Sequence, residues 1–163
     1  MLGFDVRHYT LDLLEPKKDG YTLQMNGFGP RTALLDIVHL PFLPMLCARF
    51  PGALWIRTSR NRTNWITSCL NHTPVWQNRE NEVEVRARWL RRKVYGHAHP
   101  SRVEFERAWA SWNRTFDDIV AERAHLNFNI CAGDGWAALC AFLGCSPPPG
   151  AYPHIRDGTV TPP

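Results

Sequence analysis

Apolar residues recur at two different periods along this chain, and segments of the two kinds alternate. The clearest helical period lies in residues 100–123, where large apolar residues follow one another at intervals of three and four. These residues are Phe105, Trp109, Trp112, Phe116 and Ile119. Such spacing places them on one face of a helix, and Ser101 with Glu104 has the S-x-x-E pattern of a capping box. We therefore expect a long helix whose apolar face belongs to the core.

Shorter helices are predicted elsewhere by the same spacing and by end signals. Residues 43–49 show helical spacing of apolar side chains, and another helix is expected after Thr63, which is a suitable N-cap. A further helix is predicted between Asp134, as the N-cap, and Gly144, as the residue that ends it. Each of these helices follows a short apolar or turn-forming segment.

A basic helix is expected over residues 80–96. Its inward side chains are predicted to be Val85, Trp89 and Val94. Its basic side chains are Arg86, Arg88, Arg91, Arg92 and Lys93. We interpret them as a solvated helix face, with an anionic acceptor or a membrane surface as the alternative partner.

Strands are predicted between the helices. Residues 3–14 resemble a strand with Phe4 and Val6 on one face, followed by a polar break at "EPKKDG" that we interpret as a loop. "ALWIRTS" at 53–59 is expected to be a buried strand, and "LNFNI" at 126–130 another. Alternating strands and helices predict one α/β layered domain over residues 1–163 with a parallel sheet. Residues 144–163 are expected to form a proline-rich irregular tail.

Composition and charge narrow the possible functions only a little. The chain has 163 residues, 44% of them hydrophobic, and a net charge of +4, which fits an anionic ligand, a nucleic acid or a membrane surface. The five cysteines form no C-x-x-C pair, so reduced thiols and no metal site are expected. There is no secretion signal or run long enough for a membrane span, so we expect a cytoplasmic protein.

Three arginines follow the predicted strand at 53–59, in the stretch "FPGALWIRTSRNRTNWITSCLN". A strand that leads into a helix N-terminus presents free backbone N–H groups and a positive dipole end, which favour an anion. Arg60 stands at the strand exit and Ser68 eight residues later, so a guanidinium and a hydroxyl could reach one phosphate. A solvated loop with surface arginines is the alternative. Arg57 is expected to pack or pair beside the strand.

The same stretch resembles the segment of sulfotransferases that binds the 3′-phosphate of 3′-phosphoadenosine 5′-phosphosulfate (PAPS). In that family an arginine ends a strand and a serine follows eight positions later, as Arg60 and Ser68 do here; Arg62 replaces the proline that is usual in the family. "NFNICAGDGWAALCAFLGCSPPPGAYPH" is similar to the C-terminal end of a bacterial-type group in this family. "LLDIVHLPFLPMLCARFPG" resembles the segment that precedes its phosphate-binding strand.

The resemblance implies transfer of a sulfuryl group from PAPS to a hydroxyl or amine acceptor, with 3′,5′-adenosine bisphosphate as the product. It implies that Arg60 and Ser68 bind the 3′-phosphate, that Arg62 adds positive potential and that Arg156 contacts the nucleotide. The catalytic base would be His39, in "VHLPFLP", or Asp36, which is otherwise a hydrogen-bonding partner of that base. The acceptor and the oligomeric state are not predicted.

The implied fold is P-loop-NTPase-like. "LGFDVRHY" resembles the strand that follows the loop for the 5′-phosphosulfate in this family, so the chain is expected to be N-terminally incomplete and weakly active or inactive on its own. "NGFGPRT" at 26–32 is an alternative for that loop, but a Gly-Pro turn explains it as well.

Two other function classes compete with a sulfotransferase. The first is a non-catalytic interaction protein that keeps the fold and uses its basic surface. Nucleic-acid binding is not expected, because the aromatic residues lie at helical core spacing and do not alternate with basic residues.

Overall fold

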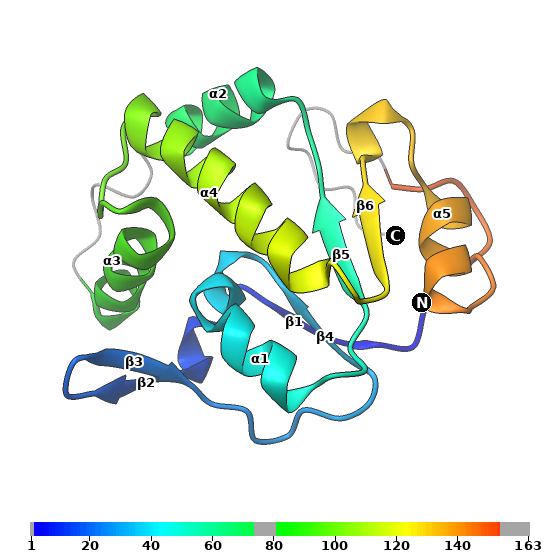
Figure 1. Cartoon of the computed structure of the whole chain (residues 1–163), viewed down its shortest axis with the longest axis horizontal. Helices are drawn as coiled ribbons and strands as arrows, with labels where there is room; N and C mark the ends of the chain where they lie inside the picture. The colour runs from blue at the N-terminus through cyan, green and yellow to red at the C-terminus, as the bar shows by residue number, and fades with distance from the viewer. Residues whose placement is uncertain (1, 74–80, 154–163) are drawn as a thin grey trace.

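The computed structural model describes residues 2–73 and 81–153, and parallel strand pairs form its centre (Figure 1). β1 (Asp5–His8) pairs in parallel with β4 (Thr32–Leu35), and β5 (Trp55–Thr58) pairs in parallel with β6 (His125–Phe128). Within the described residues no strand pairing joins β4 to β5. The prediction of an α/β domain with parallel strands is confirmed.

Helices surround these strand pairs. The α-helices are α1 (Leu43–Arg49), α2 (Arg62–His72), α3 (Glu82–Tyr95), α4 (Arg102–Val120) and α5 (Trp136–Leu143). The 3-10 helices are η1 (Leu11–Leu13), η2 (Ile37–Phe42) and η4 (Ile130–Ala132). The Ser101–Glu104 capping box at the start of α4 is present, as predicted.

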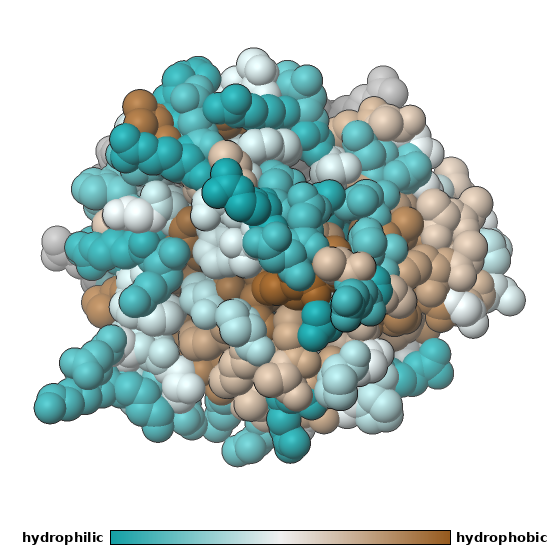
Figure 2. Space-filling view, viewed as in Figure 1, coloured by the Kyte–Doolittle hydropathy of each residue, from teal (hydrophilic) through white to brown (hydrophobic). Residues whose placement is uncertain are grey.

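α4 and α5 lie on opposite faces of the β5–β6 pair (Figure 1). Arg57 on β5 points toward α4 and reaches its Asp117. Phe128 on β6 points the other way, to Tyr152, which in turn contacts Trp136 of α5. On the face shown in Figure 2, the surface over α5 is mostly apolar, which matches its sequence "WAALCAFL".

The main core lies between the N-terminal region and α3. Its buried residues are Leu11, Leu13, Leu14, Leu23, Val38, Leu46, Ala87, Leu90 and Val94. A second contact joins α2 to α4, where Trp65 packs against Phe105 and Trp109 with ring centroids 5.9 and 5.2 Å apart. These contacts hold the ends of β4 and β5 in place beside α2 and α3.

The structure corrects the expected loop at "EPKKDG". β2 (Leu14–Lys17) and β3 (Gly20–Leu23) form an antiparallel hairpin there. Gly20 adopts φ +136°, and a Cβ at this position would lie 2.6 Å from Nε1 of Trp89, so the turn needs glycine. The Asp-Gly pair was the available signal for a hairpin. The "NGFGPRT" segment leads directly into β4, with Gly29 N donating to the Thr32 hydroxyl at 2.9 Å.

Helix ends and faces also differ from the predictions. The N-cap of α2 is Asn61, not Thr63, because the Asn61 side chain accepts a hydrogen bond from Asn64 N. Asp134 does not cap α5; its carboxylate accepts from Asn129 N at 2.6 Å and holds the preceding turn. Val85 on α3 is exposed instead of buried.

The predicted burial of the strand at 53–59 is only partly correct. Trp55 and Arg57 are partly covered, whereas Leu54 and Ile56 are exposed. Val6 and Leu35 are exposed on the β1–β4 pair as well. Alternate residues of a strand face opposite sides of a sheet, so one side of each pair is covered more completely than the other.

Candidate functional site

The carboxyl ends of the parallel strands carry two polar residues that the sequence singled out, Asp36 and Arg60, and one that it did not, His8. β1 ends at His8, β4 leads into Asp36, and β5 leads into Arg60. In open α/β sheets, ligands bind outside the carboxyl ends of the strands. We therefore treat these three strand ends, with the helices that follow them, as the candidate site.

Arg60 lies between β5 and α2, where its side chain is exposed to solvent. Asn61 caps the eleven-residue helix α2, and the uncapped N–H groups of this first turn add a positive dipole end. Arg62 is also exposed and lies 3.9 Å from Glu106 on α4. The N-terminal end of α2 therefore carries positive charge, although Glu106 offsets part of the charge of Arg62.

Arg57 has a structural role. Its guanidinium donates to Asn127 at 2.8 Å, Asn113 at 3.2 Å and Asp117 at 2.8 Å. It also lies over the ring of Phe116, 4.9 Å from the centroid. The prediction that Arg57 pairs beside its strand is confirmed.

The charge of Arg60 affects the pKa of a thiol within α2. Burial raises the pKa of the Cys69 thiol to about 11, and the Arg60 guanidinium acts against that rise. The positive charge therefore lies close enough to Cys69 to stabilise a thiolate there. Ser68, which is half-buried, immediately precedes Cys69. Arg60 precedes α2 by two residues and Ser68 lies within this helix.

Asp36 occupies a strained position at the end of β4. Its φ is +78°, a left-handed conformation that costs a non-glycine residue about 1–3 kcal/mol. The carboxylate makes two contacts: Oδ1 accepts from Ile37 N at 2.5 Å, and Oδ2 lies 3.2 Å from His8 Nε2. Asp36 thus starts η2 and pairs with a histidine that the sequence reasoning did not select.

His39 lies inside η2 and is 5% exposed. Neither ring nitrogen forms a hydrogen bond of normal geometry with the described residues. Burial lowers the pKa of His39, while the Arg7 backbone and the Asp36 carboxylate act in the opposite direction. His39 is therefore held neutral and turned away from solvent in this conformation.

This environment predicts a pH dependence of stability. The pKa of His39 falls below its ordinary value of 6.5 on folding, so the unfolded chain binds more protons between the two values. Stability is then complete above about pH 6.5 and decreases as the pH falls through the folded pKa. We expect urea midpoints from pH 8 to pH 5 to fall less steeply for His39→Gln than for the wild type. The exposed His125→Gln variant should keep the wild-type slope, and equal slopes in all three proteins would contradict the prediction.

Tyr95, at the end of α3, connects the Asp36 and Arg60 regions electrostatically. Burial raises the pKa of its phenol most strongly, and Cys69, Asp36 and Tyr9 each raise it further. Tyr95 is therefore within electrostatic range of a residue on α2 and of the end of β4. The ring of Tyr95 itself packs edge-on against Phe105 of α4, with centroids 5.0 Å apart.

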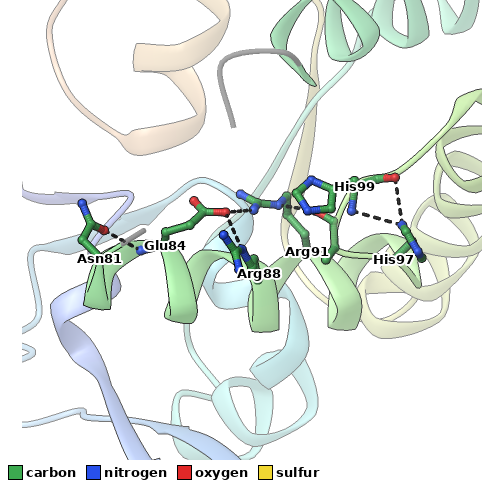
Figure 3. A network of polar contacts seen from close by, with 7 residues as sticks. Asn81, Glu84, Arg88, Arg91, His97 and His99 are labelled. Atoms are coloured by element: carbon green, nitrogen blue, oxygen red, sulfur yellow. Dashed lines mark hydrogen bonds and ion pairs between the residues drawn. The ribbon is translucent and has the colours of Figure 1, made fainter. Parts of the chain in front are cut away.

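The basic face of α3 is not simply solvated. Arg91 is buried and binds the buried carboxylate of Glu84, and its Nε donates to the carbonyl of Ala98 at 2.6 Å (Figure 3). Arg88 contacts the same carboxylate at 3.2 Å. Arg86 binds Glu82 at 2.7 Å. The prediction of a solvated Arg91 is wrong, because Glu84 and the turn after α3 enclose it.

Two histidines after α3 have a local structural role, and one predicted nucleotide contact lies outside the described residues. His97 Nδ1 accepts a hydrogen bond from His99 N at 3.1 Å, so these two histidines belong to the turn after α3 (Figure 3). Arg156 lies outside the described residues. His8 and Tyr9 were missed, and the signal for them was the polar "RHY" at the end of a predicted strand.

The fold is that of an α/β protein, and two exposed arginines, Arg60 and Arg62, lie at the junction of β5 and α2. A family model described as "Sulfotransferase domain" matches residues 17–160, and the chain therefore belongs to the sulfotransferase family. The family resemblance noted in the sequence is thus confirmed. A search of curated proteins found no match for the chain. None of the described helices is long and apolar enough to cross a membrane.

Proposed function

We propose that this chain is a PAPS-dependent sulfotransferase domain that transfers a sulfuryl group to a hydroxyl or amine acceptor. A sulfotransferase domain needs a sulfuryl donor and an acceptor, and the family match covers most of the chain. Recognition of the sulfuryl donor therefore requires cationic side chains and N–H groups that can bind its phosphate oxygens. The α2 region supplies both.

The observation that carries this proposal is the position of Arg60. It follows β5 directly, at the start of a capped helix, and its charge acts on Cys69 beside Ser68. A 3′-phosphate at this junction would receive the guanidinium of Arg60, the hydroxyl of Ser68 and the dipole of α2. Arg62 would add positive potential, and Arg156 is proposed as a further nucleotide contact.

The acid–base chemistry is proposed to lie at the end of β4. The acceptor must lose a proton while its oxygen or nitrogen attacks the sulfur atom. Asp36 is at the carboxyl end of a parallel strand with one oxygen directed at His8. His39 stays a candidate base whose ring would have to become accessible, because it is 5% exposed here.

The competing interaction-protein function receives little support from the basic helix. Arg86, Arg88 and Arg91 all bind acidic side chains of their own helix. Their positive charge is thus partly neutralised within α3, which leaves less for an anionic partner.

Calorimetric titration with 3′,5′-adenosine bisphosphate tests the proposed function. We expect saturable binding, and at least tenfold weaker binding of 5′-adenosine monophosphate, because that nucleotide lacks the phosphate assigned to Arg60 and Ser68; a loss of about 1.4 kcal/mol corresponds to tenfold. Circular dichroism would establish that the chain is folded. A folded chain that binds neither nucleotide, or both equally, would overturn the proposal.

A further inference from the structure

We infer that His8 is the general base of this domain and that Asp36 is its positioning residue. The inference rests on the proposed sulfuryl transfer. The acceptor O–H proton moves to the unprotonated Nδ1 of His8 while the acceptor oxygen forms a bond to sulfur. The bond from sulfur to the bridging phosphate oxygen breaks, and its electron pair leaves with 3′,5′-adenosine bisphosphate. The imidazolium then returns its proton to water.

The geometry of the pair assigns the roles of the two ring nitrogens. His8 Nε2 lies 3.2 Å from Asp36 Oδ2. We therefore assign the ring proton to Nε2, on the side of the carboxylate, and the free lone pair to Nδ1. The other carboxylate oxygen is held by the Ile37 backbone N–H at 2.5 Å. A base whose second nitrogen is oriented by a carboxylate is the arrangement that catalytic histidines need.

Accessibility separates His8 from His39. The His8 side chain is 67% exposed and that of Asp36 is 29% exposed, so an acceptor can approach Nδ1 while the carboxylate stays partly shielded. His39 is buried, and neither of its nitrogens has a well-formed hydrogen bond in the described residues. Of these two histidines, His8 alone is both close to a carboxylate and open to solvent.

The backbone around the pair is strained on both strands. His8 lies opposite Leu35 in the parallel register, and the residues that follow them, Tyr9 and Asp36, have φ values of +47° and +78°. These are the described non-glycine residues with positive φ. Such strain persists where surrounding contacts hold it, and it concentrates at functional sites.

Charged and titratable groups from neighbouring elements surround the pair. Tyr9 is within electrostatic range of Asp36 and also of Glu84 and Arg91 on α3. Tyr95 is within range of Asp36, Tyr9 and Arg91. The pair thus sits beside a polar cluster of strand ends and α3, whereas an isolated surface pair would have no such surroundings.

The first test observes the His8 ring directly. Long-range ¹H–¹⁵N spectra of the full chain at pH 8, with His8→Asn used for assignment, should show Nε2 protonated and Nδ1 unprotonated. In Asp36→Asn the side-chain amide would face Nε2, so the tautomer should change to Nδ1–H. A wild-type Nδ1–H tautomer would contradict the proposed pairing of His8 with Asp36. Identical His8 signals in wild type and Asp36→Asn would contradict it as well.

The second test measures turnover with PAPS as the donor and 2-naphthol as a probe acceptor. We expect His8→Asn to lower kcat by about 100-fold or more, the usual contribution of general-base catalysis. Its calorimetric affinity for 3′,5′-adenosine bisphosphate should be unchanged. The control variant His125→Asn, at the amino end of β6, should turn over as the wild type does.

Equal measurable turnover of wild type and His8→Asn would overturn the role of His8. Failure of the wild-type chain to bind the bisphosphate would instead overturn the proposed function.

Discussion

Arg60→Ala is expected to weaken binding of 3′,5′-adenosine bisphosphate by about 10- to 100-fold. The guanidinium supplies hydrogen bonds to a charged phosphate, each worth about 1.5–3 kcal/mol, and tenfold in affinity is about 1.4 kcal/mol. Arg60 is exposed and makes no ion pair among the described residues. Its removal should therefore leave the fold intact, and isothermal titration calorimetry would measure the loss.

A matched control removes the same charge elsewhere. Arg49 is exposed at the end of α1, so Arg49→Ala lowers the net charge equally without touching α2. Affinity should change less than twofold in this variant, whereas Ser68→Ala should lose less than Arg60→Ala because a neutral donor is removed. Equal losses in Arg60→Ala and Arg49→Ala would show that only the overall charge matters, and the assigned phosphate site would be wrong.

Glu84→Ala is expected to lower the free energy of unfolding by about 3–5 kcal/mol, the usual cost of removing one partner of a buried ion pair. The side chains of Glu84 and Arg91 are 6% and 3% exposed. The variant removes the Glu84 carboxylate from the buried guanidinium of Arg91, whose Nε also donates to the carbonyl of Ala98. Urea unfolding followed by circular dichroism would measure the loss.

Two further variants separate this effect from helix propensity. Glu82 lies on the first turn of the same helix, with an 80% exposed side chain paired to Arg86, so Glu82→Ala should cost less than about 1 kcal/mol. The double variant Glu84→Leu with Arg91→Met should recover much of the stability, because apolar residues can replace a buried pair. If Glu84→Ala cost no more than Glu82→Ala, the pair would not stabilise the fold.

Predictions from sequence succeeded where the determining interactions are local. The start of α4 depends on Ser101 and Glu104, three residues apart, and the end of α5 depends on Gly144 at φ +64°. The α1 segment and the strands β5 and β6 followed from apolar spacing in the same way. The β2–β3 hairpin was missed because its polar residues outweighed the Asp-Gly turn signal.

The site was only partly predictable for a related reason. Arg60, Ser68 and Asp36 stood out through their order along the chain and the family resemblance. His8 could not be chosen, because its partner Asp36 is distant in sequence and meets it only through the parallel pairing of β1 with β4. Arg91 was misjudged because Glu84 and the turn at Ala98 enclose it.

The sequence by itself determined the alternation of helices and strands, the capped start of α4 and the sulfotransferase family of this chain. These properties depend on neighbouring residues and on a motif read in order. Only the tertiary structure decided which arginines are available to an anion and which histidine faces solvent. Burial and pairing depend on segments far apart in the chain, so Arg57 and Arg91 became structural, His39 became enclosed, and His8 came to lie beside Asp36.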